Sequence, residues 1–219
     1  MNILLAFVDL IPVFLFLFGI IIYQRLFYNK MSKGAFAIYA TGGITIFVAG
    51  LIKAIHKILY YTEVCDFTRL EQAFFPMQTV GYVLLGIAVI AILFFNQHEV
   101  NSNNQLKSFI FVPILAAPAV YSGTMVFVSL MVLGVIIHDT ALIIYATRLK
   151  KDKVLTIILV SISLFMTLGM GYLSSQEGIN DWIKEIVNTV AQGAFFLSAL
   201  LFKKNNLEDK DFNVKLINK

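Results

Sequence analysis

Long apolar runs alternate with short polar segments along the whole chain. Seven such runs occur, and all but one reach the length of about 20 residues that an α-helix needs to cross the hydrocarbon core of a bilayer. Strands of a membrane barrel would show alternating segments of about 10 residues instead. The pattern therefore predicts an all-α, polytopic membrane protein. The predicted spans are residues 3–27, 34–60, 72–95, 106–121, 124–147, 154–173 and 182–202.

Composition agrees with a membrane location. Hydrophobic residues make up 59% of the chain and charged residues only 14%, whereas about 25% of the residues in a soluble protein are charged. These values exclude a soluble enzyme and a disordered tail protein. The single cysteine, Cys65, excludes a disulfide scaffold. We expect a multi-pass protein of the cell membrane (the plasma or inner membrane), in contact with the lipid bilayer.

The first apolar run could be mistaken for a secretory signal. It covers residues 3–27, lacks a basic segment before it and has no small-residue cleavage pattern. The apolar region of a secretory signal has only about 7–15 residues. The sequence therefore favours a retained first span.

The fourth run is the weak point of the topology, because it is short and contains Pro113 and Pro118. A re-entrant segment there would leave six crossings. The positive-inside rule favours seven, because most of the 17 basic residues then lie on one side, including the cluster at 148–153 and the C-terminal tail. The prediction is a seven-transmembrane-helix bundle over residues 1–204, with the N-terminus outside and the C-terminus cytoplasmic. Residues 205–219 are predicted to form a flexible cytoplasmic tail.

Glycines and prolines within the predicted spans indicate how the helices pack. Small residues let helix backbones approach closely in a membrane, and prolines kink helices. The glycines expected at close helix contacts are Gly42, Gly43, Gly50, Gly81, Gly86, Gly169 and Gly171. The prolines expected to kink helices are Pro12, Pro76, Pro113 and Pro118.

Polar side chains recur at a similar depth in four of the predicted spans. With a rise of about 1.5 Å per residue, Asp9, Lys53 and Gln78 lie about 9 Å outward from the middle of their spans. An ionisable group within a bilayer costs about 2.5–3.5 kcal/mol on insertion scales, so each one needs an explanation. The seventh span carries a polar stripe with helical spacing, from its outer end to its centre. This stripe consists of Asp181, Lys184, Glu185, Asn188 and Gln192.

These positions predict an outward-facing polar funnel between the first, second, third and seventh helices, with charges of both signs. Two interpretations stay open at this point. The funnel could hold a small ligand or a lipid headgroup. Alternatively, Lys53 could extend outward to the membrane surface, and Asp9 and Glu185 could pair with lysines to hold helix ends together. The candidate ligand-binding residues are Asp9, Lys53, His56, Gln78, Glu185, Asn188 and Gln192.

A second polar group lies on the fifth span, where His138 and Asp139 are placed about 6–8 Å to the cytoplasmic side of the centre. Ser161 and Ser163 of the sixth span reach a similar level. Adjacent residues on a helix point about 100° apart, so we expect only one of the pair to face the interior. The pair could act as a proton relay or as a hydrogen-bonded latch between helices. His56 lies at the opposite depth from His138, so we expect no metal site and no cofactor.

Known motifs restrict the function further. A heptahelical topology with the N-terminus outside resembles that of rhodopsins, but residues 188–192 hold no lysine for retinal. The chain also lacks the internal repeat of carriers that are built from triple-helix repeats. It contains no H-E-x-x-H, G-x-S-x-G or P-loop signature. Asp9 and Asp139 are predicted at opposite depths, too far apart for an aspartic dyad. We therefore assign no catalytic residues and favour a non-enzymatic protein.

The function that the sequence favours is a receptor-like or sensor-like protein with an outward-facing polar pocket. Because no soluble output domain is present, signalling would need a cytoplasmic protein partner. A small-solute or proton-coupled transporter is the alternative, and a lipid-modifying enzyme is a third. We expect no nucleic-acid partner, because the net charge of +4 reflects orientation signals. A homo-oligomer is compatible with the sequence.

Overall fold

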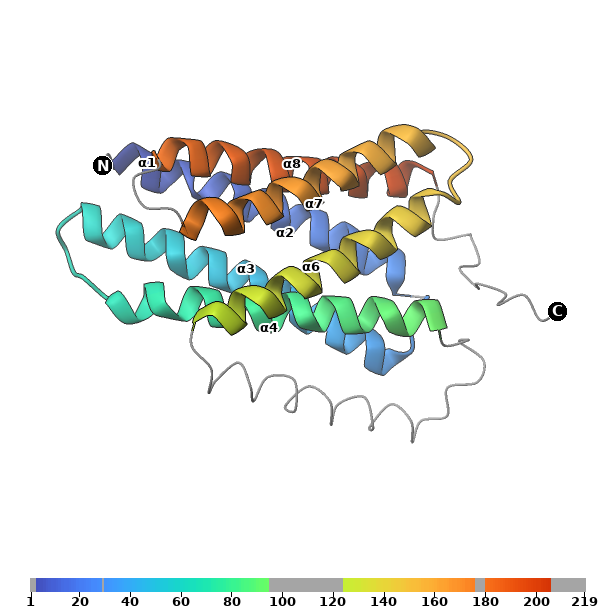
Figure 1. The fold of residues 1–219 in the computed structure, drawn as a ribbon, viewed down its shortest axis with the longest axis horizontal. Helices are drawn as coiled ribbons and strands as arrows, with labels where there is room; N and C mark the ends of the chain where they lie inside the picture. Colours follow the sequence, from blue (N-terminus) through green and yellow to red (C-terminus); the bar gives the residue numbers. More distant parts are fainter. Residues whose placement is uncertain (1–2, 29, 95–123, 176–179, 206–219) are drawn as a thin grey trace.

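The computed structural model describes residues 3–28, 30–94, 124–175 and 180–205, and all regular secondary structure in these ranges is helical (Figure 1). This confirms the all-α fold. The predicted fourth span, 106–121, lies outside the described residues, as does the tail from residue 206 onward. The helices are α1 (Ile3–Val8), α2 (Leu10–Phe27), α3 (Lys33–Tyr61), α4 (Thr68–Phe94), α6 (Thr124–Ala146), α7 (Lys153–Ser175) and α8 (Asp181–Lys204).

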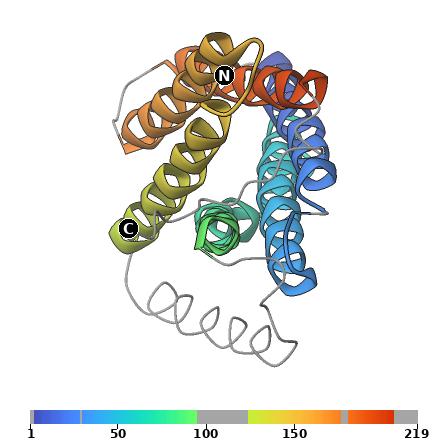
Figure 2. The same cartoon turned by 90° about the vertical axis from the view of Figure 1, so that its right-hand side faces the viewer.

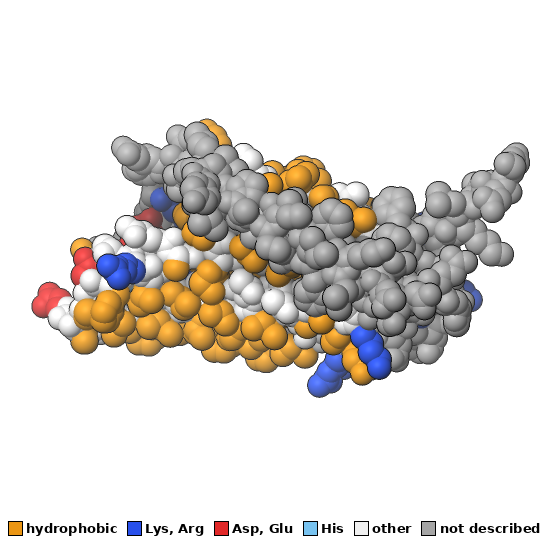
Figure 3. Space-filling view, turned by 90° about the horizontal axis from the view of Figure 1, so that it is seen from below, with side chains coloured by type: hydrophobic (Ala, Val, Ile, Leu, Met, Phe, Trp, Pro, Cys, Tyr) orange, Lys and Arg blue, Asp and Glu red, His pale blue; other side chains and the backbone are white. Residues whose placement is uncertain are grey.

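Six helical segments among the described residues are long and apolar enough to cross a membrane, as a multi-pass membrane protein requires. The segments α1 and α2 together form the first of these, Ile3–Phe27. Hydrophobic side chains cover the flank of the bundle between two ends that carry charged groups (Figure 3). The six predicted spans that fall on described residues are thus confirmed as helices, with boundaries that differ by a few residues.

The helices pack in a closed ring, in the order α2, α3, α4, α6, α7, α8 and back to α2 (Figure 2). Neighbours in the ring are antiparallel except for two pairs, α2 with α8 and α4 with α6. Phe16 of α2 packs on Phe195 of α8, and Tyr23 further along α2 contacts Ser198 and Phe202 further along α8, so these two helices run in the same direction. The Thr79 hydroxyl on α4 donates a 2.9 Å hydrogen bond to the Phe127 carbonyl near the start of α6, and Gly86 further along α4 faces Gly134 further along α6. These two helices therefore run in the same direction. The end of α4 and the start of α6 consequently lie at opposite ends of the bundle.

The bundle has two ends, which we name after the loops that they carry. The α3–α4 loop end holds residues 62–67 and the starts of α1, α4, α6 and α8. The α6–α7 loop end holds residues 147–152 and the last turn of α8. The described chain thus begins at one end and leaves α8 at the other (Figure 1).

The first span is interrupted at Asp9, and Pro12 accounts for the interruption. A proline lacks the backbone N–H and its ring clashes with the carbonyl four residues earlier, which here belongs to Val8. The helix α1 ends at Val8, and Asp9 forms a turn before α2 begins. The break places the Asp9 side chain at the α3–α4 loop end. Pro76 lies inside α4.

Several glycines permit the close helix contacts that the sequence predicts. A Cβ on Gly42 of α3 would lie 2.7 Å from the Gly81 carbonyl of α4, so the two backbones need both glycines. Gly43, Gly50 and Gly86 also face neighbouring helices. The prediction is wrong for Gly169 and Gly171 of α7, where a Cβ would meet no described atom within 4 Å.

Aromatic side chains fill the half of the bundle near the α6–α7 loop end. Tyr23, Phe27, Tyr39, Tyr145 and Phe202 are fully buried, and Phe27 contacts three of the other rings. Each of these residues lies near the end of its helix that faces the α6–α7 loop. The cavities described next lie in the other half and in the middle of the bundle.

Candidate functional site

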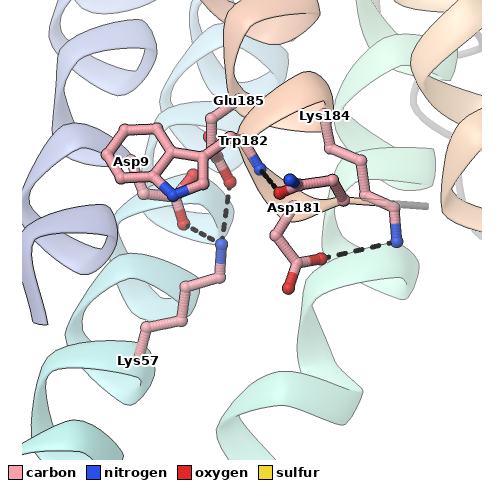
Figure 4. Close-up of polar contacts among 7 residues, drawn as sticks. Asp9, Lys57, Asp181, Trp182, Lys184 and Glu185 are labelled. Carbon is pink, nitrogen blue, oxygen red and sulfur yellow. Dashed lines mark hydrogen bonds and ion pairs between the residues drawn. The ribbon is translucent and has the colours of Figure 1, made fainter. Parts of the chain in front are cut away.

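A buried ion cluster joins three helices at the α3–α4 loop end (Figure 4). Lys57 Nζ lies 2.7 Å from Asp9 Oδ2 and 2.8 Å from Glu185 Oε1. Both carboxylates are buried, with 3% of each residue exposed. Asp9 stands at the N-cap position of α2, but its side chain makes no capping bond and turns to Lys57 instead. The cluster thus joins α2, α3 and α8 through a single ammonium group.

A cavity of about 530 Å³, which we call the vestibule, opens beside this cluster. Charges of both signs line it, and several are paired: His56 Nε2 lies 3.3 Å from Asp66 Oδ1, and Lys184 Nζ lies 3.5 Å from Asp181 Oδ1. The buried Oε2 of Glu185 accepts no hydrogen bond from the described residues. The lining residues are Lys53, His56, Lys57, Tyr60, Tyr61, Asp66, Thr68, Glu71, Phe74, Phe75, Met170, Asp181, Lys184 and Glu185.

A smaller cavity of about 40 Å³, the inner pocket, adjoins the vestibule because Lys53 and Phe74 line both. The Lys53 ammonium lies 4.3 Å from the centroid of the Phe74 ring. No carboxylate of the described residues lies within 4.0 Å of Lys53 Nζ, in contrast to Lys57. The other lining residues are Asp9, Pro12, Val13, Phe16, Ile46, Phe47, Gly50, Gln78, Tyr82, Asn188 and Gln192.

A third cavity of about 10 Å³, the core pocket, shares Phe16, Tyr82 and Gln192 with the inner pocket. It reaches His138 and Asp139 of α6, together with residues of α7 and α8. The three cavities therefore follow one another from the α3–α4 loop end toward the middle of the bundle. Ser163, which the sequence placed near this level, also lines the core pocket.

Both residues of the His138–Asp139 pair face the interior, which corrects the expectation that only one would. His138 Nδ1 lies 2.8 Å from Asp139 Oδ1, and the opposite ring nitrogen, Nε2, lies 3.2 Å from the Tyr39 hydroxyl of α3. His138 is 1% exposed and Asp139 is 5% exposed. In the ring, α6 contacts α4 on one side and α7 on the other. The surface of α6 between these two contacts faces the interior, and it is wide enough to include both residues.

The structure brings the predicted ligand-binding residues into two adjoining cavities. His56 and Glu185 line the vestibule, and Lys53 lies at its junction with the inner pocket. The remaining four, Asp9, Gln78, Asn188 and Gln192, line the inner pocket. The alternative interpretation also finds support, because Asp9 and Glu185 do pair with a lysine.

Three residues of the site are not among the candidate ligand-binding residues that the sequence indicates. Lys57 carries the ion cluster, Phe74 holds the Lys53 ammonium, and Tyr39 contacts His138. Lys57 lies one helical turn from Lys53, so its position was visible in the sequence. Nothing in the sequence pairs Tyr39 with His138, because that contact depends on how α3 and α6 approach across the ring.

Comparisons with protein families, curated proteins and solved structures give no match for this chain. Within the described ranges, no three His, Cys, Asp or Glu side chains come together in a way that could hold a metal ion. The geometry of the cavities is therefore the basis for assigning a function.

Proposed function

We propose that this protein is a receptor-like or sensor-like integral membrane protein that binds a small polar ligand or a lipid headgroup in the vestibule. The observation that carries the proposal is a cavity of about 530 Å³ with charged lining, which adjoins an inner pocket at Lys53, whose ammonium has no carboxylate of the described residues within 4.0 Å. Ligand pockets in proteins have volumes of about 300–1,000 Å³. The polar lining of the cavity suits an occupant with polar groups, because lipid tails are poor partners for its side chains.

Lys53 is the residue most suited to contact a ligand. Lys57 is saturated by two carboxylates, whereas Lys53 contacts an aromatic ring and no carboxylate of the described residues. An anionic group at Lys53 would form a charge-assisted hydrogen bond in a partly dehydrated site. The amides of Gln78, Asn188 and Gln192 add donors and acceptors below it. A carboxylate or phosphate group fits this set.

Native mass spectrometry of the purified protein tests the proposal. A co-purified molecule is expected as a discrete mass shift of the parent protein. Extraction then identifies the source, because a phospholipid enters the organic phase and a small solute stays in the aqueous phase. In Lys53→Met the bound fraction is expected to fall about tenfold or more, the effect of losing one hydrogen bond to a charged group.

Lys150→Met is the matched control, since Lys150 is an exposed lysine in the α6–α7 loop. It removes the same charge at the opposite end and should leave the bound fraction unchanged. Equal retention of the molecule by the parent protein and Lys53→Met would contradict the proposed site. The absence of any bound molecule from both detergent and lipid-nanodisc preparations would contradict the proposed function.

A small-solute or proton-coupled transporter is the second candidate. The row of three adjoining cavities, which extends from the vestibule to His138, favours it. The buried aromatic rings near the α6–α7 loop end would then have to move apart to complete a passage. Uptake of the identified ligand into proteoliposomes supports the transporter, and binding without uptake supports the receptor.

A further inference from the structure

The pair of His138 and Asp139 lies deep in the bundle, yet it lines a cavity in the row that begins at the vestibule. Lys53 and Phe74 connect the vestibule with the inner pocket, and Tyr82 and Gln192 connect the inner pocket with the core pocket. A water molecule needs a volume of about 10–15 Å³ and two to four polar partners. The inner pocket has room for about three waters and the core pocket for about one.

Polar partners for such waters are present along the row. Gln78 and Asn188 line the inner pocket, and Gln192 reaches both the inner and the core pocket. On the α7 side, the residues that line the core pocket include Ser163 and Thr167, whose side chains carry hydroxyls. A chain of waters between these groups can carry a proton from one hydrogen-bonded position to the next.

The net charge of the core pocket depends on whether the pair of His138 and Asp139 holds an extra proton. No lysine, arginine or second carboxylate lines the core pocket, so His138 is the described group that can compensate the charge of Asp139. The other described titratable groups near the pair are three tyrosines, Tyr23 of α2, Tyr39 of α3 and Tyr82 of α4. Neutral imidazole already carries one ring proton. When the pair of imidazole and carboxylate holds a second proton, the net charge of the pair is zero. Without this proton the net charge is −1, and an isolated buried charge is costly.

We propose that His138 and Asp139 form a proton-binding site that exchanges its proton with the vestibule through waters in the inner and core pockets. The proton enters from water at the vestibule, binds to the pair and leaves by the same route. No other reactant is needed, and the net charge of the pair changes by one. The proton-binding pair is separate from the proposed ligand contact at Lys53, although the water route passes Gln78, Asn188 and Gln192 of the ligand pocket. Loss of ligand binding in Lys53→Met tests the ligand site, whereas exchange at His138 tests the proton-binding site.

Hydrogen exchange at the His138 ring tests the proposal in the full-length protein in lipid nanodiscs. The three histidines are labelled with ¹⁵N, and the His138 signal is assigned by its loss in His138→Gln. The measured quantity is the exchange rate of the ring N–H with water. In Gln192→Leu, which keeps the side-chain size but removes the amide shared by two cavities, this rate should fall about tenfold or more.

Gln24→Leu is the matched control, because Gln24 lies on α2 toward the other end of the bundle, outside the three cavities. It should leave the exchange rate unchanged. If Gln192→Leu does not fold, Asn188→Leu in the inner pocket replaces it with the same expected result. The proposal is overturned if His138 does not exchange in the parent protein. It is also overturned if the His138 ring N–H exchanges as fast in a folded Gln192→Leu or Asn188→Leu protein as in Gln24→Leu.

Discussion

Lys53 and Lys57 lie one helical turn apart on α3, yet their surroundings differ. Lys57 forms two ion pairs with buried carboxylates, whereas Lys53 lies over an aromatic ring. The depth of the polar residues in the sequence allows the acidic groups of the first and last spans to pair with lysines, which is one of the two interpretations that the sequence leaves open. It does not predict which lysine they meet, because that choice depends on the level at which Asp9 and Glu185 approach α3.

The difference predicts opposite effects of two similar substitutions on stability. Lys57→Met leaves the carboxylates of Asp9 and Glu185 buried without their cation and should lower the free energy of unfolding by about 3–5 kcal/mol. Lys53→Met removes an ammonium that has no described carboxylate partner, so it should change stability little. Unfolding in detergent, followed by far-UV circular dichroism, measures both variants against the parent protein.

Neutralising the cluster is the control for this prediction. The triple variant with Lys57→Met, Asp9→Asn and Glu185→Gln has no uncompensated charge and should regain most of the lost stability. An Lys57→Met protein that is as stable as the parent would show that the cluster contributes nothing to folding. Lys53→Met as destabilised as Lys57→Met would show that the two lysines share one role.

At the level of helices, the arrangement of the ring determines which glycines lie at close helix contacts. Gly134 and Gly169 both lie within membrane-length helices, and their sequence context alone does not separate them. In the structure, a Cβ on Gly134 of α6 would lie 2.6 Å from the Tyr82 carbonyl carbon of α4, whereas Gly169 of α7 meets no described atom within 4 Å. The sequence shows a small residue but not the backbone opposite it.

The same limit explains the error at His138 and Asp139. The angular separation of about 100° between these residues predicts that only one of them faces the interior and that the other lies at a helix contact. In the ring, α6 has α4 on one side and α7 on the other, and the interior lies between them. Two neighbouring residues on α6 can therefore both be buried there. The width of the interior depends on the number of helices around it, which no single helix reveals.

The glycine contrast gives a matched pair of variants. Gly134→Ala forces α4 and α6 apart because the clash is with backbone atoms, and overpacking of this kind costs about 1–3 kcal/mol. The added methyl group of Gly169→Ala meets no described atom within 4 Å, and the higher helix propensity of alanine should leave stability equal or raise it by up to about 1 kcal/mol. Thermal unfolding midpoints in one detergent measure both. A Gly134→Ala protein at least as stable as Gly169→Ala would contradict the close α4–α6 contact.

At the level of the whole molecule, the parallel α4 and α6 constrain the topology. The chain leaves α4 at the α6–α7 loop end and begins α6 at the α3–α4 loop end, so the connection between them joins opposite ends of the bundle. This supports the proposal of a further crossing between the two helices, which the sequence places at 106–121. On the positive-inside rule, we propose that the α6–α7 loop end, which carries Arg148, Lys150, Lys151 and Lys153, is cytoplasmic.

Cysteine labelling tests the number of crossings and the orientation together. Cys65 is the single cysteine of the chain and lies partly exposed in the α3–α4 loop. With seven crossings and the N-terminus outside, a membrane-impermeant maleimide should label Cys65 in intact cells. In the variant with Cys65→Ser and Lys150→Cys, labelling should require permeabilised cells, because three crossings separate the two positions. Equal labelling of both positions in intact cells would contradict a crossing between α4 and α6, and the reverse pattern would place the vestibule on the cytoplasmic side.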